Sequence, residues 1–136
     1  MNHLFFKVLF FISFTLYFIL KDEMLWKCKS AYGKTLFVIH HFVISVNLFS
    51  GLLFNLNLLN IIIVVLTASS WLIMDKCFIS IMHNKLCGQD NKDFLHIGTL
   101  LREYIGNKLN IKIHYMWELI ILFIILCYNI IMIRNK

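Results

Sequence analysis

The 136-residue chain contains no proline, and only 15% of its residues are charged. Membrane proteins tolerate proline and use it for kinks and broken helices, so its absence predicts straight helices and argues against the discontinuous helices of many transporters. The chain is 60% hydrophobic, whereas soluble domains are about 45–50% apolar. A soluble fold of this length could not bury so much apolar surface. We therefore expect a single membrane domain, residues 1–136.

Recognisable catalytic motifs are also missing. The chain has no glycine-rich phosphate loop and no nucleophile elbow. Glu118 is the only carboxylate expected within or close to the membrane boundary, and its position in the first turn of a helix is explained by the helix dipole. We therefore predict that the protein is not an enzyme and carries no cofactor.

Four long apolar runs are present. A hydrocarbon core is crossed by roughly 20 helical residues. Residues 35–54 and 56–74 are separated by little more than Asn55, which predicts a transmembrane hairpin. Residues 4–20 and 115–133 predict one span before and one after it. The expected fold is all-α with four transmembrane helices. The first run lacks the basic start and small-residue cleavage site of a signal peptide, so we expect an uncleaved anchor.

A polar stripe runs along the second apolar segment. His40 and Asn47 are seven residues apart and share a helix face, and His41 and Ser45 lie close to that face. Such side chains are costly in lipid, so we expect them to face the other helices.

The longest polar segment, residues 75–114, contains a stretch of mixed character at about 77–105. Phe94, Leu101 and Tyr104 recur there at helical spacing, which is typical of an amphipathic helix in the membrane interface. The alternative is an ordinary connecting loop with a helical turn. The residues expected to dock a partner are Trp71, Cys77, Phe94, Leu101 and Trp117.

Lysine and arginine are distributed unevenly between the apolar runs. Residues 21–34 hold four (Lys21, Lys27, Lys29, Lys34) and residues 75–114 hold six (Lys76, Lys85, Lys92, Arg102, Lys108, Lys112). Only Arg134 and Lys136 follow the last span. The positive-inside rule therefore predicts that both long segments are cytoplasmic and both termini are not. The net charge of +6 fits this topology and lipid headgroups better than nucleic acid.

The four cysteines, Cys28, Cys77, Cys87 and Cys127, form no CxxC pair and are too widely spaced for a dense disulfide framework. The first three would face the reducing cytoplasm, where stable disulfides are not expected.

Histidines and cysteines suggest two cofactor sites, each with a simpler alternative. A b-type haem could be held by His40 or His41 together with His114, but these side chains could instead form hydrogen bonds within the bundle or lie among headgroups. A zinc site could use Cys77, His83, Cys87 and His96, although their spacing differs from that of the usual structural zinc pairs. The simpler alternative is that Cys77 and Cys87 are half-buried small hydrophobic side chains against the membrane surface.

The segment IHHFVISVNLFSG, a second apolar helix ending in Trp71, and DKCFISIMHNKLCG resemble a group of small multi-span membrane proteins of large DNA viruses, with more distant bacterial members. The matching positions are His41, Gly51, Trp71, Cys77, Ile79-Ser80, Leu86 and Ile133-Arg134. Ser70 stands where the group often has histidine, and Asn84 where glutamate is common. The resemblance implies a small integral membrane protein of a virion or virus-remodelled membrane, and no established activity.

Three functions fit these observations. The first is a structural or assembly role in a virion inner membrane or host endomembrane, in contact with lipids and with other membrane, capsid or complex subunits. The second is an accessory or anchor subunit of a respiratory complex in the mitochondrial inner membrane, adjacent to haem or quinone. The third is a pore or small transporter lined by the polar stripe.

Overall fold

The computed structural model describes residues 3–25, 28–74, 76–89, 104, 108 and 116–135. In this part of the chain the long elements are helices: α1 (His3–Leu25), α2 (Ala31–Phe54), α3 (Asn57–Met74), α4 (Phe78–Cys87) and α6 (Met116–Arg134). The all-α prediction is confirmed for these residues. Among them, α1, α2 and α3 are long and apolar enough to cross a membrane, and α6 contributes a shorter apolar stretch, Leu119–Arg134.

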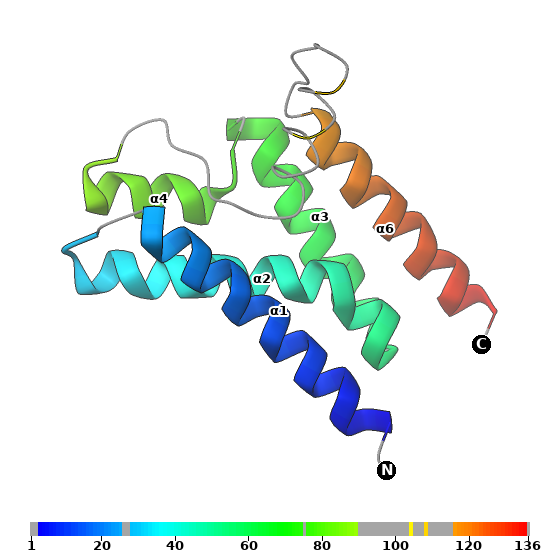
Figure 1. The fold of residues 1–136 in the computed structure, drawn as a ribbon. Coiled ribbons are helices and arrows are strands. Elements are labelled where there is room, and N and C mark those ends of the chain that lie inside the picture. The colour runs from blue at the N-terminus through cyan, green and yellow to red at the C-terminus, as the bar shows by residue number, and fades with distance from the viewer. Residues whose placement is uncertain are drawn as a thin grey trace.

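Helix α2 is the central element. It packs against α1, α3, α4 and α6, and α6 packs mainly against α3. Figure 1 shows α4 lying along the first half of α2, while α1 crosses α2. The α2–α3 turn lies on the same side of the molecule as the start of α1 and the end of α6 (Figure 1). Segments that are distant in the sequence are therefore joined through α2.

Local sequence signals determine where the helices end. The Ser30 hydroxyl accepts a hydrogen bond from the Gly33 N–H and caps the start of α2. Asn55 adopts the left-handed conformation, with φ of 57°, and its N–H bonds back to Gly51. Lys7 donates a 2.7 Å hydrogen bond to the carbonyl of Leu53, one of the last carbonyls of α2. The predicted turn at Asn55 is confirmed.

Helix α4 occupies the first part of the segment for which an interfacial helix was predicted. Its polar side chains Ser80, His83 and Asn84 are buried, whereas Phe78 and Leu86 are exposed. This helix therefore directs its polar side at α2 rather than at headgroups. Gly88 ends it with φ of 62°. The rest of the predicted amphipathic stretch, including Phe94, His96 and Leu101, lies outside the described residues, except for the exposed Tyr104.

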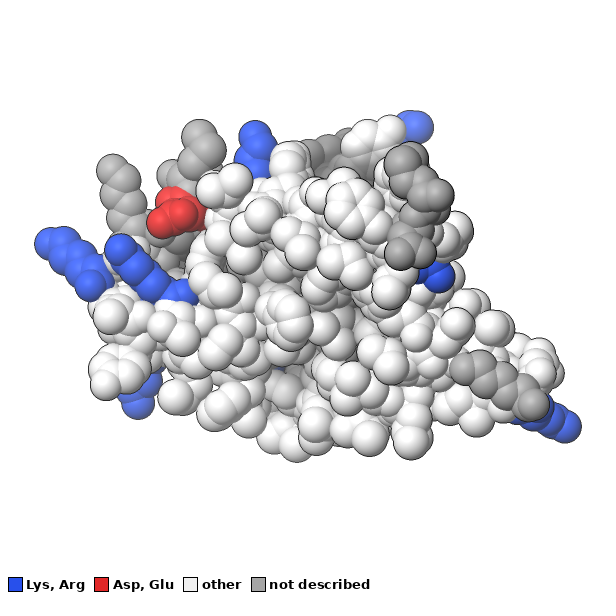
Figure 2. All heavy atoms as spheres, turned by 90° about the horizontal axis from the view of Figure 1, so that it is seen from below, with Lys and Arg blue, Asp and Glu red and all other residues white. Residues whose placement is uncertain are grey.

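The burial pattern is the reverse of that in a water-soluble domain. Thirteen described polar or charged side chains are buried, against five hydrophobic ones. Large apolar side chains cover the outside of α1, α2, α3 and α6. Figure 2 shows a broad uncharged face with lysine and arginine at its margins. Large exposed apolar patches are uncommon on water-soluble monomers and mark membrane or protein contact surfaces, so the surface suits a lipid environment.

Candidate functional site

Asn60 of α3 is the centre of a polar cluster between three helices. Its side-chain amide lies 3.0 and 2.8 Å from the carbonyls of Val46 and Asn47, and 2.7 Å from the Ser50 hydroxyl, all on α2. Its oxygen accepts a 2.7 Å hydrogen bond from Asn129 of α6. Asn60 is fully buried. Because a buried amide is costly without hydrogen-bond partners, these bonds favour one arrangement of α2, α3 and α6.

Gly51 is what allows α6 to come so close to α2. A Cβ atom at Gly51 would collide with the side-chain oxygen of Asn129 and lie 3.0 Å from its Cγ. The glycine and the asparagine therefore form one contact, in which the missing side chain makes room for the amide.

A second polar cluster joins α1 to α2. The Nε2 atom of His41 lies 2.9 Å from Oδ2 of Asp22, and both side chains are almost completely buried. One helical turn further on, Thr15 donates a 2.8 Å hydrogen bond to the Ser45 hydroxyl. Ser45 in turn donates to the carbonyl of His41. The predicted polar stripe on α2 therefore faces other helices.

The contact between α2 and α4 is built on two further histidines. The Nδ1 atom of His40 lies 3.3 Å from the hydroxyl of Ser80. Within α4, the Nδ1 atom of His83 lies 3.1 Å from Oδ1 of its neighbour Asn84. The ring of Phe37 packs against the ring of His83 on the neighbouring helix, with the ring centres 5.8 Å apart. These contacts explain why the polar side of α4 is buried.

A disulfide bond links Cys28, which precedes α2, to Cys87 at the end of α4. The prediction that cysteines on this side form no stable disulfide is therefore wrong for this pair. Cys28 and Cys87 are 59 residues apart in sequence, but α4 folds back along α2 and brings their Cα atoms within 5.0 Å. No sequence spacing reveals such a pairing, because it depends on the packing of two helices.

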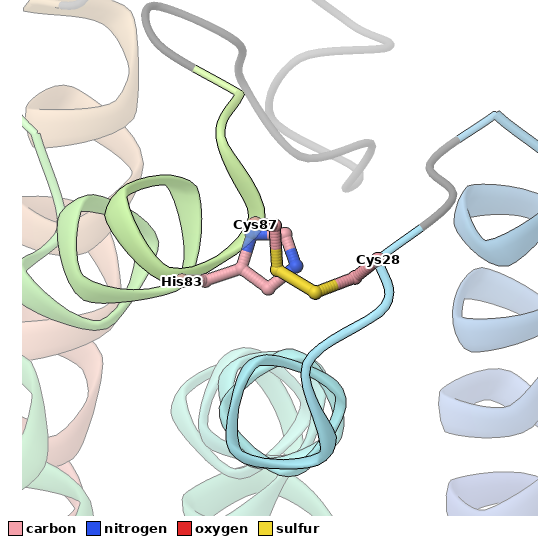
Figure 3. Close-up of side chains that lie close together, drawn as sticks. All are labelled: Cys28, His83 and Cys87. Atoms are coloured by element: carbon pink, nitrogen blue, oxygen red, sulfur yellow. A yellow bond between two sulfur atoms is a disulfide. The ribbon is translucent and has the colours of Figure 1, made fainter.

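His83 lies directly beside this disulfide (Figure 3). The ligand atoms of Cys28, His83 and Cys87 are all within 4.8 Å of one another. Next to them is a hollow of about 80 Å³. It is lined by Ile19, Glu23, Cys28, Lys34, Phe37, Val38 and His83. This is a compact group of thiol-derived and imidazole ligands beside a small space.

Only part of the predicted metal-ligand set lies together in the structure. His83 and Cys87 belong to this cluster, but its third member is Cys28 and not Cys77 as predicted. Cys77 is buried at the start of α4, and burial raises the pKa of its thiol. His96 lies outside the described residues.

The predicted haem ligands His40 and His41 point at partners within the bundle. Their rings contact Ser80 and Asp22, respectively, and their ring centres are 5.7 Å apart. The structure therefore favours the simpler expectation for both, that of hydrogen bonding within the bundle. His114 lies outside the described residues.

Of the predicted docking residues, the structure describes the side chains of Trp71 and Cys77. Trp71 is half-buried near the end of α3, and Cys77 is buried. Trp117 and Glu118 belong to the first turn of α6, but their side chains, like Phe94 and Leu101, are outside the described residues.

Sequence reasoning missed Asp22, Cys28 and Asn129 as members of these clusters. Asn129 stands in an otherwise apolar run, and a single amide in such a run is a signal for a helix contact. Asp22 lies among lysines and another acid, where nothing distinguishes a buried carboxylate from a solvated one. Comparisons with protein-family models, curated proteins and solved structures found no match to this chain.

Proposed function

We propose that the protein is a non-enzymatic integral membrane protein with a structural or assembly role in a virion or virus-remodelled membrane. The observation that supports this proposal is that polar side chains point into the helix bundle and apolar side chains point outward. The side chains of Asn60, Asn129 and Ser45 form hydrogen bonds inside the bundle, while the outer surface is apolar. Such a molecule offers lipids and neighbouring membrane proteins a rigid apolar surface. The viral setting comes from the sequence resemblance alone.

We further propose that the protein spans the membrane four times, with both termini on the non-cytoplasmic side. The ten lysines and arginines of the two long connecting segments support this orientation. The arrangement of the helices supports an even number of spans, because the start of α1, the α2–α3 turn and the end of α6 lie on one side (Figure 1).

The orientation can be tested by protease protection. In sealed vesicles with the cytoplasmic side outward, an epitope tag after Lys136 should survive added protease, and a tag inserted between Asp90 and Asn91 should be removed. Digestion of the C-terminal tag in sealed vesicles would contradict the orientation.

The assembly role can be tested by cross-linking in the source membrane. The double variant Phe94→Ser with Leu101→Ser removes the apolar side chains proposed to dock a partner. The variant Asp93→Ser is a matched control on the polar side. The double variant should lose a specific cross-linked partner that wild type and Asp93→Ser retain, while all three stay in the membrane after carbonate extraction. The role is contradicted if wild type yields no specific partner, or if the double variant keeps it.

A further inference from the structure

We propose that Cys28, His83 and Cys87 form a binding site for Zn²⁺, or a similar thiophilic divalent cation, when the disulfide is reduced. The biological setting of this site rests on the proposed topology, whereas the chemistry of the site does not. Two thiolates and one imidazole are the ligands of choice for Zn²⁺, at about 2.3 Å for sulfur and about 2.0–2.1 Å for nitrogen.

The fold already holds the three ligands together. Cys28 comes from the segment before α2, and His83 and Cys87 are one helical turn apart on α4. Their ligand atoms lie within 4.8 Å of one another, and Figure 3 shows the imidazole beside the two sulfurs. Once the sulfur–sulfur bond is cleaved, rotation of two cysteine side chains is enough to surround one ion, because the backbones of α2 and α4 remain packed.

The surroundings of His83 suit a metal ligand. Its ring is buried, and Nδ1 lies 3.1 Å from Oδ1 of Asn84. In the tautomer in which Nδ1–H donates to this oxygen, Nε2 carries the lone pair that a metal requires. An amide or carboxylate oxygen bonded to the other ring nitrogen is the usual support of a ligating histidine.

The first turn of α2 suits two thiolates. A Cβ atom on Gly33 would collide with the sulfur of Cys87 and lie 2.6 Å from that of Cys28, so both sulfurs rest on a position without a side chain. They lie at the helix N-terminus, where the helix dipole favours negative charge. Lys34 and Glu23 line the same hollow with charges of opposite sign, so the favourable field at the two sulfurs comes from the helix N-terminus.

The hollow beside the cluster provides a place for the fourth ligand. Its volume of about 80 Å³ is enough for water, since a molecule of liquid water occupies about 30 Å³. A site with three protein ligands and one water is a common arrangement for zinc.

The proposed topology makes the reduced state the relevant one. Both connecting segments are placed in the cytoplasm by their lysines, and cytoplasmic thiols are kept reduced. A cysteine and histidine cluster in that compartment points to metal binding more than to a structural disulfide. In this proposal the disulfide seen in the structure is the oxidised form of the site, and the reduced form is the one that a cytoplasmic location would maintain.

The exchange between the two forms balances with a small-molecule thiol as reductant. Two thiol molecules donate two electrons and two protons to the Cys28–Cys87 disulfide and become one disulfide. The two protein thiols then lose two protons as they bind the cation.

The test uses the full chain, purified in detergent, reduced with a phosphine and then freed of reductant without oxygen. Titration with Co²⁺ should give sulfur-to-cobalt charge-transfer absorption at one ion per chain, which Zn²⁺ should displace. The oxidised protein should give no such absorption.

Cys28→Ser and His83→Ala should each weaken binding at least tenfold, and Asn84→Ala should weaken it by about tenfold through loss of support for His83. Cys77→Ser, a matched control at a cysteine outside the cluster, should bind as wild type does.

Circular dichroism of each variant shows whether it retains the helices, and Asn84→Ala leaves all three ligands in place. The proposal is overturned if reduced wild type binds no Co²⁺, or if Cys77→Ser weakens binding as much as Cys28→Ser. These measurements need no membrane orientation. A failed protease-protection experiment would therefore overturn the proposed topology without affecting the metal-binding result. A failed Co²⁺ titration would overturn the metal site without affecting the proposed topology.

Discussion

The imidazole of His41 on α2 and the carboxylate of Asp22 near the end of α1 approach to 2.9 Å, and both are almost fully buried. Breaking a buried pair by removing one partner costs about 3–5 kcal/mol, whereas replacing both with apolar residues is far less damaging. His41→Leu should therefore lower the unfolding free energy by about that amount, and His41→Leu with Asp22→Leu by less. Unfolding by dodecyl sulfate in mixed micelles, followed by circular dichroism, measures both. Equal losses in the single and double variants would argue against a coupled pair.

Asn60 should contribute more to the free energy of unfolding than a residue that makes only one hydrogen bond. It bonds to three groups on α2 and to Asn129 on α6, and polar contacts between membrane helices average about 0.6 kcal/mol each. Asn60→Leu should cost about 1–2 kcal/mol in the same unfolding assay. Asn135→Leu makes the same chemical change at an exposed position and should have little effect. If the two variants lose similar stability, the α2–α3–α6 cluster is not a stabilising element.

The contact between Gly51 and Asn129 predicts a rescue. Gly51→Ala should destabilise the protein by about 1–3 kcal/mol, because the new methyl group has no room beside the asparagine side chain. Asn129→Ala removes that side chain, so adding Gly51→Ala to it should cost less than adding it to wild type. A double-mutant cycle gives the coupling. Strictly additive effects would contradict the contact.

The thiol of Cys77 should titrate at unusually high pH. Burial raises its pKa above the ordinary value of 9.0, although hydrogen bonds with Ile79 and Ser80 oppose this. Only the thiolate is alkylated quickly, so in a Cys127→Ser background iodoacetamide should react with a midpoint above pH 9. Because the fold favours the neutral thiol, Cys77 adds to the free energy of unfolding while the thiol is protonated. This contribution is complete below the pKa of the thiol in the unfolded chain, and it is lost as pH rises through the pKa of the thiol in the folded protein. A midpoint at or below pH 9 would contradict this.

The helices of this protein could be predicted from the sequence because their cause is local. Each predicted span coincides with a helix, and the turn at Asn55 follows from the ease with which asparagine adopts a left-handed conformation. The helices also extend past the apolar runs. Helix α1 continues to Leu25 through Lys21, Asp22 and Glu23, because hydropathy marks only the part of a helix that suits lipid and not the place where its hydrogen bonding stops.

The inward direction of the polar stripe could also be predicted from the sequence, since His40, His41 and Ser45 lie in an apolar run in which an outward polar face would be costly in lipid. Only the tertiary structure decided which partners these residues meet. Asp22 reaches His41, Asn129 reaches Asn60, and Cys28 reaches Cys87 across gaps of 19, 69 and 59 residues. Those pairings depend on how α1, α4 and α6 pack around α2, and helix packing is determined by the complementary shapes of whole surfaces rather than by the period of any one segment.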